Sequence, residues 1–284
     1  MKSFSYHAPR TLADVFEVVD AYGEDAHLIA GGTALVLLMK QGLVQPAHVV
    51  SLRDVDGLGA IHASPGLTLG ALATHRQLEV SPAVRAYDAS LARAFAEVAT
   101  IRIRSMATLG GNLVHADPAQ DPPPMLIALR AEVVLLARDG ERRVPLDEFF
   151  VDYFETAIRH GEVLTRVELP PKPAARRTHY VKFLPRTADD YATVAVATAI
   201  DFDADGMVED ARIVLGAAAP TVLRARAAED VLRGQKLTPE LMREAGALAR
   251  TAADPLDDSR GSAAYKKEMV AVWVRRSLEH LLTL

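Results

Sequence analysis

The 284-residue sequence contains no cysteine. The chain can therefore form neither a disulfide nor a cysteine-ligated iron–sulfur cluster or zinc site. Any such redox centre would have to lie on another chain.

Long apolar runs and an excess of basic charge are also missing. The longest tight apolar runs, such as residues 34–39, are far shorter than the roughly 20 residues that span a bilayer. The N-terminus lacks the apolar core of a signal peptide, so we expect a cytoplasmic protein without a membrane span. The formal net charge of -5 gives no broad basic surface, which argues against nucleic acid as the main partner.

The sequence also lacks the common catalytic and nucleotide-binding signatures. We find no G-x-S-x-G elbow, no G-x-x-x-x-G-K loop and no G-x-G-x-x-G fingerprint at the expected places. Hydrolase and NTPase functions therefore lose their usual support. Half of the residues are apolar, and the length predicts about two globular domains.

One glycine pair stands between a predicted strand and a predicted helix. Residues 26–30 form an apolar run of strand length, Gly31 and Gly32 form a turn with Thr33, and residues 34–40 have a helical pattern ended by Gly42. A helix N-terminus presents unpaired N–H groups that favour a phosphate. Taken alone, however, such a glycine pair is most often just a tight turn.

The stretch from residue 108 to residue 124 is the most unusual in the chain. It carries Gly110 and Gly111, then acidic side chains, and it ends in three consecutive prolines, which we expect to prevent regular helix. His115, Asp117 and Asp121 could supply ligands to a divalent cation, but the carboxylates could equally cap backbone N–H groups. We favour a ligand-binding loop and predict no metal site.

The remaining pattern predicts a mixed α and β chain. We expect a capped helix from residue 11, β-hairpins over 58–71 and 133–146, a long helix over 86–101, a strand over 163–169 and a boundary near residue 172. Beyond it we expect three strands over 178–183, 191–202 and 207–215, and then helices over 223–233, 239–251 and 262–282. The two glycine loops are about eighty residues apart, and a ligand with a pyrophosphate could bind both through backbone N–H groups and threonine hydroxyls.

Three stretches carry a family resemblance. They are residues 28–33 (LIAGGT), residues 103–121 (IRSMATLGGNLVHADPAQD), and Tyr180 to Phe183 together with Asp189 to Ala192. They resemble the FAD-binding medium subunit of molybdenum hydroxylases, a group that includes the carbon monoxide dehydrogenase and xanthine dehydrogenase flavoproteins. The resemblance extends over essentially the whole chain.

The resemblance implies an α+β fold. Residues 1–172 would form an FAD-binding domain of the p-cresol methylhydroxylase/vanillyl-alcohol oxidase type, with subdomains at about 1–55 and 56–172. Residues 173–284 would form a C-terminal domain with a three-stranded antiparallel sheet and helices. The cofactor would lie between the two subdomains.

The resemblance also implies a set of cofactor-binding residues. Two loops would line the FAD diphosphate, Asp121 would hold a hydroxyl of the FAD, and Leu164 and Lys182 would lie by its ends. Val98 takes a position where relatives can place an apolar side chain near the cofactor. The full implied set is Leu28, Ile29, Ala30, Gly31, Gly32, Thr33, Ala34, Leu35, Thr108, Leu109, Gly110, Gly111, Asn112, Asp121, Leu164 and Lys182.

The sequence departs from the family pattern at two places. Relatives often carry Ser or Asp where this chain has Ala34, and the usual Asn-Arg-Gly before the second loop is replaced by Ser105, Met106 and Ala107. These changes affect single contacts near the flavin and leave both glycine pairs intact.

In such enzymes, as the resemblance implies, a large subunit holds the molybdenum cofactor (molybdopterin) and a small subunit holds two 2Fe–2S clusters. This chain would carry FAD and pass electrons to an external acceptor, within a dimer of heterotrimers. We expect no catalytic side chain, since the flavin performs the redox chemistry. A self-contained FAD oxidoreductase and a non-catalytic nucleotide-binding module are the alternatives.

Overall fold

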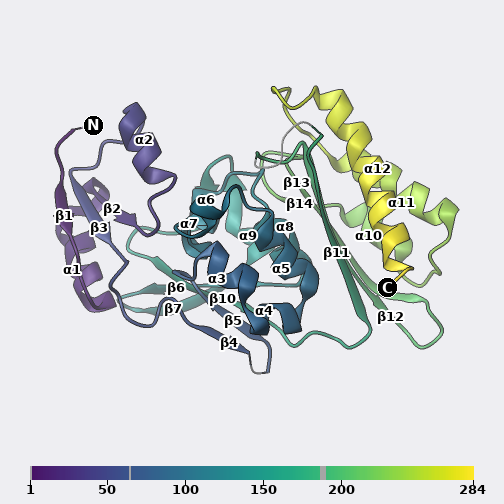
Figure 1. The fold of residues 1–284 in the computed structure, drawn as a ribbon, viewed down its shortest axis with the longest axis horizontal. Coiled ribbons are helices and arrows are strands. Elements are labelled where there is room, and N and C mark those ends of the chain that lie inside the picture. Colours follow the sequence, from purple (N-terminus) through teal and green to yellow (C-terminus); the bar gives the residue numbers. More distant parts are fainter. Residues whose placement is uncertain (1, 64, 186–189) are drawn as a thin grey trace.

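The computed structural model describes residues 2–63, 65–185 and 190–284, so Asp189 of the third stretch lies outside the described residues. Three sheets of three, five and four strands follow one another across the molecule (Figure 1), and the described residues also form a separate two-stranded sheet. The described part is a mixture of helix and sheet, as expected of an α+β chain. None of its helices has both the length and the apolar composition that a membrane span requires.

The first sheet is small and parallel, with the strand order β1-β3-β2. Its elements are β1 (Ser5–His7), α1 (Leu12–Tyr22), a short 3-10 helix (Gly23–Asp25), β2 (Ala26–Ile29), α2 (Leu35–Gln41) and β3 (His48–Ser51). The predicted capping box of α1 is confirmed: the Thr11 hydroxyl accepts from Asp14 N, and the Asp14 carboxylate accepts from Thr11 N. Helix α1 buries Val15, Phe16 and Val19 against this sheet.

The second sheet is antiparallel, with the strand order β4-β5-β10-β6-β7. Several short helices cover it. The sheet and its helices comprise β4 (Ile61–Ala63), β5 (Leu67–Gly70), α3 (His75–Val80), α4 (Pro82–Tyr87), α5 (Ala89–Ala96), α6 (Ile101–Arg104), α7 (Leu109–His115), α8 (Pro122–Ala128), β6 (Glu132–Ala137), β7 (Gly140–Pro145), α9 (Leu146–Phe149) and β10 (Val163–Leu169). Between α9 and β10, the strands β8 (Phe150–Asp152) and β9 (Glu155–Thr156) pair with each other in the separate two-stranded sheet.

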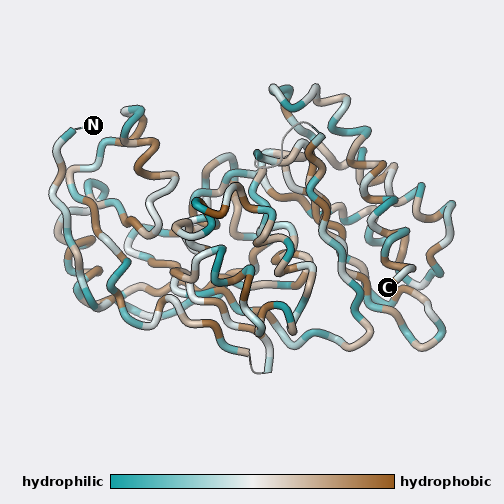
Figure 2. Tube along the Cα trace, in the orientation of Figure 1, coloured by the Kyte–Doolittle hydropathy of each residue, from teal (hydrophilic) through white to brown (hydrophobic). Residues whose placement is uncertain are grey.

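The third sheet is antiparallel and is covered on both faces. Its elements are β11 (Arg176–Phe183), β12 (Val194–Phe202), β13 (Val208–Gly216), β14 (Leu223–Arg224), α10 (Arg226–Leu232), α11 (Pro239–Ala252) and α12 (Ala263–Leu281). Along β12, Ala195, Ala197 and Ala199 join the core of the second sheet. The alternate residues Val194 and Val196 pack against the C-terminal helices, because successive side chains of a strand point to opposite faces. Figure 2 shows the resulting hydrophobic segments along these strands.

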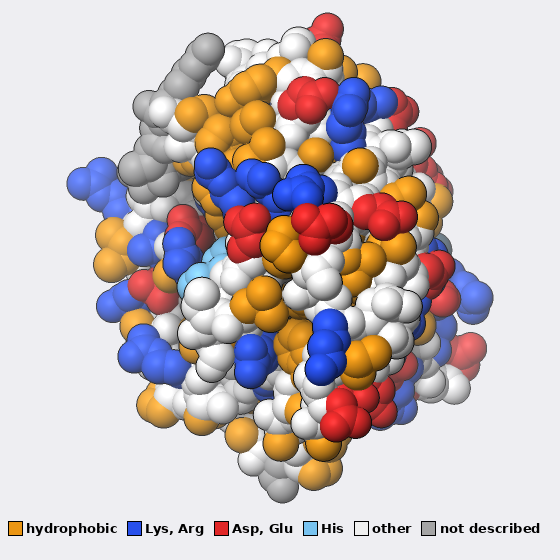
Figure 3. All heavy atoms as spheres, turned by 90° about the vertical axis from the view of Figure 1, so that its right-hand side faces the viewer, with side chains coloured by type: hydrophobic (Ala, Val, Ile, Leu, Met, Phe, Trp, Pro, Cys, Tyr) orange, Lys and Arg blue, Asp and Glu red, His pale blue; other side chains and the backbone are white. Residues whose placement is uncertain are grey.

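The outer surface of the C-terminal helices carries charged side chains among hydrophobic ones. Figure 3 shows basic and acidic side chains side by side on this face. Exposed pairs include Arg243 with Glu240 and Arg250 with Glu268. Each such pair contributes little to stability. We therefore attribute the packing of these helices to the apolar side chains on their inner side, which contact the third sheet.

Two sequence-based expectations about helices are wrong. The long helix over residues 86–101 is divided, because Asp88 adopts an extended conformation and caps α5 through Leu91 N, and Thr100 caps α6 through Ile103 N. The three prolines at 122–124 occupy the first turn of α8. Proline is tolerated there, since the first N–H groups of a helix have no intrahelical partner.

A third expectation needs correction in the C-terminal sheet. The three predicted strands are present, but β14 adds a short fourth one next to β13. The helix expected from residue 223 therefore begins only at Arg226. A two-residue strand carries no periodicity that a sequence could reveal.

A buried carboxylate stabilises this edge of the sheet. Glu229 is fully buried, accepts from Ile213 N and pairs with Arg224 at 2.7 Å. We expect Glu229→Ala to lower the free energy of unfolding by about 3 kcal/mol, because it leaves a backbone N–H and a largely buried guanidinium without this partner. Urea unfolding measures the effect. Asp230→Ala, which removes the exposed neighbouring carboxylate, should change stability by less than about 0.5 kcal/mol; equal effects would contradict our assignment.

Candidate functional site

A cavity of about 520 Å³ separates the first sheet from the helices of the second. Residues 28–35 line one side of it as an unbroken run, and Thr108, Gly111 and Asn112 line another. The two glycine loops therefore face the same space, as the sequence suggested. The lining residues outside these two loops are Leu37, Leu38, His75, Val98, Ala99, Ile103, Ala107, Val114, His115, Gln120, Asp121, Lys182, Asp190 and Tyr191.

The first loop packs tightly against the segment before α7. A Cβ atom at Gly31 would overlap the backbone carbonyl of Met106. Gly32 has a φ of +71°, a conformation that glycine adopts without steric cost. Both glycines are thus required by the local geometry, which brings the backbone of this loop to the cavity.

The backbone donors of the first loop are free. In the described part of the chain, the N–H groups of Gly31, Gly32, Thr33 and Ala34 have no hydrogen-bond acceptor. They stand in sequence between the end of β2 and the start of α2, and all four residues line the cavity. Successive free N–H groups at a helix start favour a bound anion.

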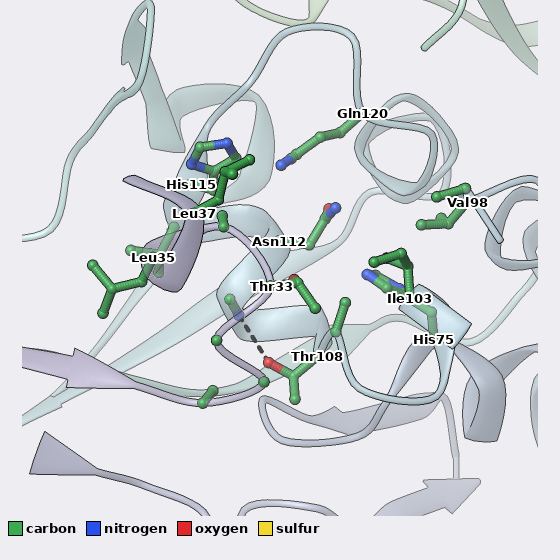
Figure 4. Close-up of a pocket in the computed structure, with 18 of the residues that line it drawn as sticks. Thr33, Leu35, Leu37, His75, Val98, Ile103, Thr108, Asn112, His115 and Gln120 are labelled. Atoms are coloured by element: carbon green, nitrogen blue, oxygen red, sulfur yellow. Dashed lines mark hydrogen bonds between the residues drawn. The ribbon is translucent and has the colours of Figure 1, made fainter. Parts of the chain in front are cut away.

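The second loop is arranged differently. Thr108 caps α7 by accepting from Gly111 N at 3.2 Å, the bond drawn in Figure 4. The N–H groups of Leu109 and Gly110 donate to Ala73 O and Ala71 O. This corrects the expectation that both loops offer free backbone donors: the second loop uses them to anchor itself to the turn after β5.

Polar side chains without partners point into the cavity from the second loop. Asn112 and Gln120 project toward the same space as Thr33 (Figure 4). Among the described residues, the buried oxygens Asn112 Oδ1 and Gln120 Oε1 have no hydrogen-bond partner. A buried amide oxygen without a partner is costly, and a polar ligand in the cavity would remove this cost.

Asp121 and Lys182 are joined to each other in the cavity wall. Lys182 Nζ lies 2.9 Å from Asp121 Oδ2 and also donates to Glu97 O, while the Tyr180 hydroxyl donates to Asp121 Oδ1 at 2.8 Å. Burial raises the pKa of Asp121 to about 6 even though Lys182 favours its ionised form. Asp121 thus joins the second loop to β11, and one of its oxygens would have to accept a further bond to hold a ligand hydroxyl.

Three residues of the implied set do not line the cavity. Leu109 and Leu164 are buried in the core of the second sheet. Gly110 packs against the backbone and side chain of Ala71, where a Cβ would come within 2.8 Å of another carbon. The other thirteen residues of the set, and Val98, line the cavity.

Several lining residues were missed by sequence reasoning. Gln120 stands beside Asp121 in the second stretch, and Tyr191 stands in the third, so the motifs themselves could have indicated them. His75 is the first residue of α3, and it is fully buried beside the cavity. Nothing in its local sequence signals that position.

Two of the three candidate metal ligands, His115 and Asp121, contact other side chains in this structure. The described residues contain no cluster of three or more His, Asp or Glu side chains that could hold a metal ion. Asp121 is turned toward Lys182 and Tyr180, and His115 contacts the ring of Phe154.

Comparisons with known proteins identify the family to which the chain belongs. Residues 2–172 match the family described as FAD binding domain in molybdopterin dehydrogenase, and residues 179–281 match the CO dehydrogenase flavoprotein C-terminal domain. The chain is 35% identical to the carbon monoxide dehydrogenase medium chain of Afipia carboxidovorans, over 98% of this chain and 96% of that one. It is 32% identical to the nicotine 6-hydroxylase medium subunit of Paenarthrobacter nicotinovorans, over 98% and 97% of the two chains.

A solved structure shares the fold throughout. Carbon monoxide dehydrogenase from Hydrogenophaga pseudoflava superposes with a TM-score of 0.95 at 34% identity, covering 99% of this chain and 98% of the other. The likeness in fold therefore extends over nearly the whole chain, including the C-terminal layer.

The buried imidazole of His75 gives a pH prediction. Burial, with a smaller contribution from the charge of Arg104, lowers its pKa from 6.5 to about 4. The unfolded chain then binds a proton more readily than the folded one between pH 6.5 and 4, so stability falls as the pH falls through this range. His75→Leu should remove up to about 3 kcal/mol of this acid destabilisation.

Urea unfolding of the flavin-free chain at several pH values measures this slope. His62→Leu, at an exposed position of β4, is the matched control and should keep the wild-type slope. An unchanged slope in His75→Leu would contradict the assignment.

Proposed function

Because this chain belongs to the family of FAD-binding medium chains of molybdenum hydroxylases, we propose that its cavity holds FAD and that the chain passes electrons from a partner's 2Fe–2S clusters to an external acceptor. The family is one of oxidoreductase components, and FAD is the cofactor of this subunit. The four consecutive free N–H groups of residues 31–34 are the observation that supports the binding site most directly.

The proposed FAD domain comprises residues 1–172, in two subdomains of about 1–55 and 56–172 and of the p-cresol methylhydroxylase/vanillyl-alcohol oxidase type, and residues 173–284 form the C-terminal domain. The arrangement of the sheets supports this division. The first sheet ends at Ser51, the second at Leu169, and the third begins at Arg176. The cavity lies where the first two meet.

The first loop would hold the diphosphate. Its free N–H groups are donors without an internal acceptor, and the positive end of α2 adds a partial charge that favours an anion. Gly111, an exposed position in the first turn of α7, leaves room for the diphosphate on the other side. The side chain of Thr33 adds a hydroxyl.

The polar groups of the second loop would hold the rest of the molecule. Asn112 and Gln120 offer unpaired amide groups, and Asp121 would accept from an FAD hydroxyl while its other bonds to Tyr180 and Lys182 keep it oriented. Apolar side chains such as Leu28, Val98 and Ile103 complete the lining and exclude water.

When bound, FAD supplies the redox chemistry by exchanging electrons with one-electron and two-electron partners. The chain itself binds and orients the cofactor. The described cavity residues include no pair of groups arranged as a nucleophile and base, so we assign no catalytic side chain.

The absence of cysteine supports a division of cofactors among chains. We propose that a small subunit carries the 2Fe–2S clusters, that a large subunit carries the molybdenum cofactor, and that the assembly is a dimer of heterotrimers. The similar proteins are named for substrates as different as carbon monoxide and nicotine. Substrate choice is therefore better assigned to the large subunit than to this one.

Flavin retention by Gly111 variants tests the proposed site. A Cβ at Gly111 would meet only the Thr108 hydroxyl, at 3.0 Å, so Gly111→Asp should fold. Its negative charge would oppose the diphosphate and weaken FAD binding by at least about tenfold. Fluorescence titration of the flavin-free chain with FAD measures the dissociation constant.

Gly59→Asp is the matched control, because a Cβ there meets nothing within 4 Å and the residue lies outside the cavity. It should bind FAD like the wild type. A wild-type chain that binds no FAD would refute the proposed function, and a folded Gly111→Asp variant with unchanged affinity would refute the position of the diphosphate.

A further inference from the structure

A second cavity, of about 440 Å³, lies at the free edge of the third sheet. It shares no lining residue with the FAD cavity. Strand β11 is the outermost strand of this sheet, and residues from α5 and from the end of α12 meet beside it. The lining residues are Ala89, Ser90, Arg93, Lys172, Arg176, Arg177, Thr178, His179, His280 and Leu284.

Consecutive side chains of β11 make contacts on opposite faces of the sheet, with α5 on one face and α12 on the other. The Thr178 hydroxyl donates to Asp88, the cap of α5. Arg177 Nη1 donates to Leu281 O, and His179 Nδ1 lies 2.9 Å from the Ser277 hydroxyl of α12. The alternation of the strand therefore directs Arg177 and His179 toward α12 and Thr178 toward α5.

The lining is basic and contains no Asp or Glu. The carboxylates that lie near it are already engaged: Asp88 binds Lys172 at 2.6 Å, Asp201 binds Arg176 through both oxygens, and Glu97 lies 3.4 Å from Arg93. Arg177 has no carboxylate partner among the described residues.

One guanidinium is buried and incompletely paired. The side chain of Arg176 is 4% exposed, and its Nη1 has no hydrogen-bond partner in the described part of the chain. Asp201 satisfies only the other two nitrogens. A buried charged donor without an acceptor is costly. An acceptor bound in this cavity could pair with Arg176 Nη1 and remove that cost.

A backbone N–H group of β11 also faces this second cavity. Ser90 Oγ donates to Thr178 O, which shows that this carbonyl points away from β12. In an antiparallel strand the N–H of the same residue points the same way, so Thr178 N–H also faces the free edge. The cavity thus combines guanidinium groups, an ammonium group and a backbone donor on different sides.

We propose that this second cavity is an anion site that binds a phosphate group. Phosphate accepts hydrogen bonds through several oxygens at once, and arginine forks match its geometry. A site surrounded by basic groups from β11, from α5 and from the segment before β11 suits such a multivalent acceptor better than a single carboxylate. The occupant would bridge the helices of the second layer and the end of α12.

Binding of radiolabelled inorganic phosphate to the FAD-loaded chain tests the proposal, by equilibrium dialysis at constant ionic strength. We expect one saturable site, weakened at least about tenfold in Arg177→Gln and in Arg93→Gln. Arg243→Gln, which removes an exposed arginine of α11, is the matched control and should bind like the wild type. Flavin content and the melting temperature report whether each variant is folded.

A parallel titration with AMP distinguishes the two sources of the phosphate group. Tighter binding of AMP assigns the site to a nucleotide, and binding no tighter than that of phosphate assigns it to inorganic phosphate. Binding of neither, or binding that does not saturate or that falls equally in all three variants, would overturn the proposal. Failure here leaves FAD binding untouched, because the two cavities share no residue.

Discussion

The close contact between Gly31 and the backbone of Met106 is the constraint on which the cavity depends. No side chain fits between these two segments, so the β2–α2 loop and the segment before α7 meet backbone to backbone. The contact places the free N–H groups of residues 31–34 and the amide side chains of Asn112 and Gln120 around one space. A larger residue at position 31 would separate the two sides of the site.

The C-terminal layer takes part in the same site. Lys182 and Tyr180, both on β11, reach Asp121 in the second loop, and Tyr191 lines the cavity. Ion pairs and hydrogen bonds fix this layer in place: Arg130 pairs with Asp210, Arg224 pairs with Asp147, and Arg212 donates to Ile127 O. Of these contacts the Arg224–Asp147 pair is largely buried, and a buried charge pair is costly to break, so we expect the third sheet to stay packed against the second.

Sequence reasoning was reliable where a residue pattern is compatible with only one local structure. The strand β10 and the capped start of α1 were predicted from local pattern, and the strand–glycine–helix order of residues 26–41 is present. It was wrong where a residue has two uses. Proline both breaks a helix and begins one, and residues 122–124 begin one. Asp88 is compatible with a helix interior by pattern, yet its side chain caps the next helix and pairs with Lys172.

The sequence by itself determined which chemistry is absent and which loops matter. Without cysteine the chain cannot hold an iron–sulfur cluster through cysteine, and the glycine pairs with their neighbouring motifs identified the family and its cofactor. Only the tertiary structure decided how the two loops divide their work. Whether an N–H group is free depends on the carbonyl groups that fold against it, and Ala71 and Ala73 supply such carbonyls to the second loop alone. The cavity beside β11 was also decided by the tertiary structure, because Arg93 and His280 are far from residues 172–179 in the sequence and meet them only at the edge of the folded sheet.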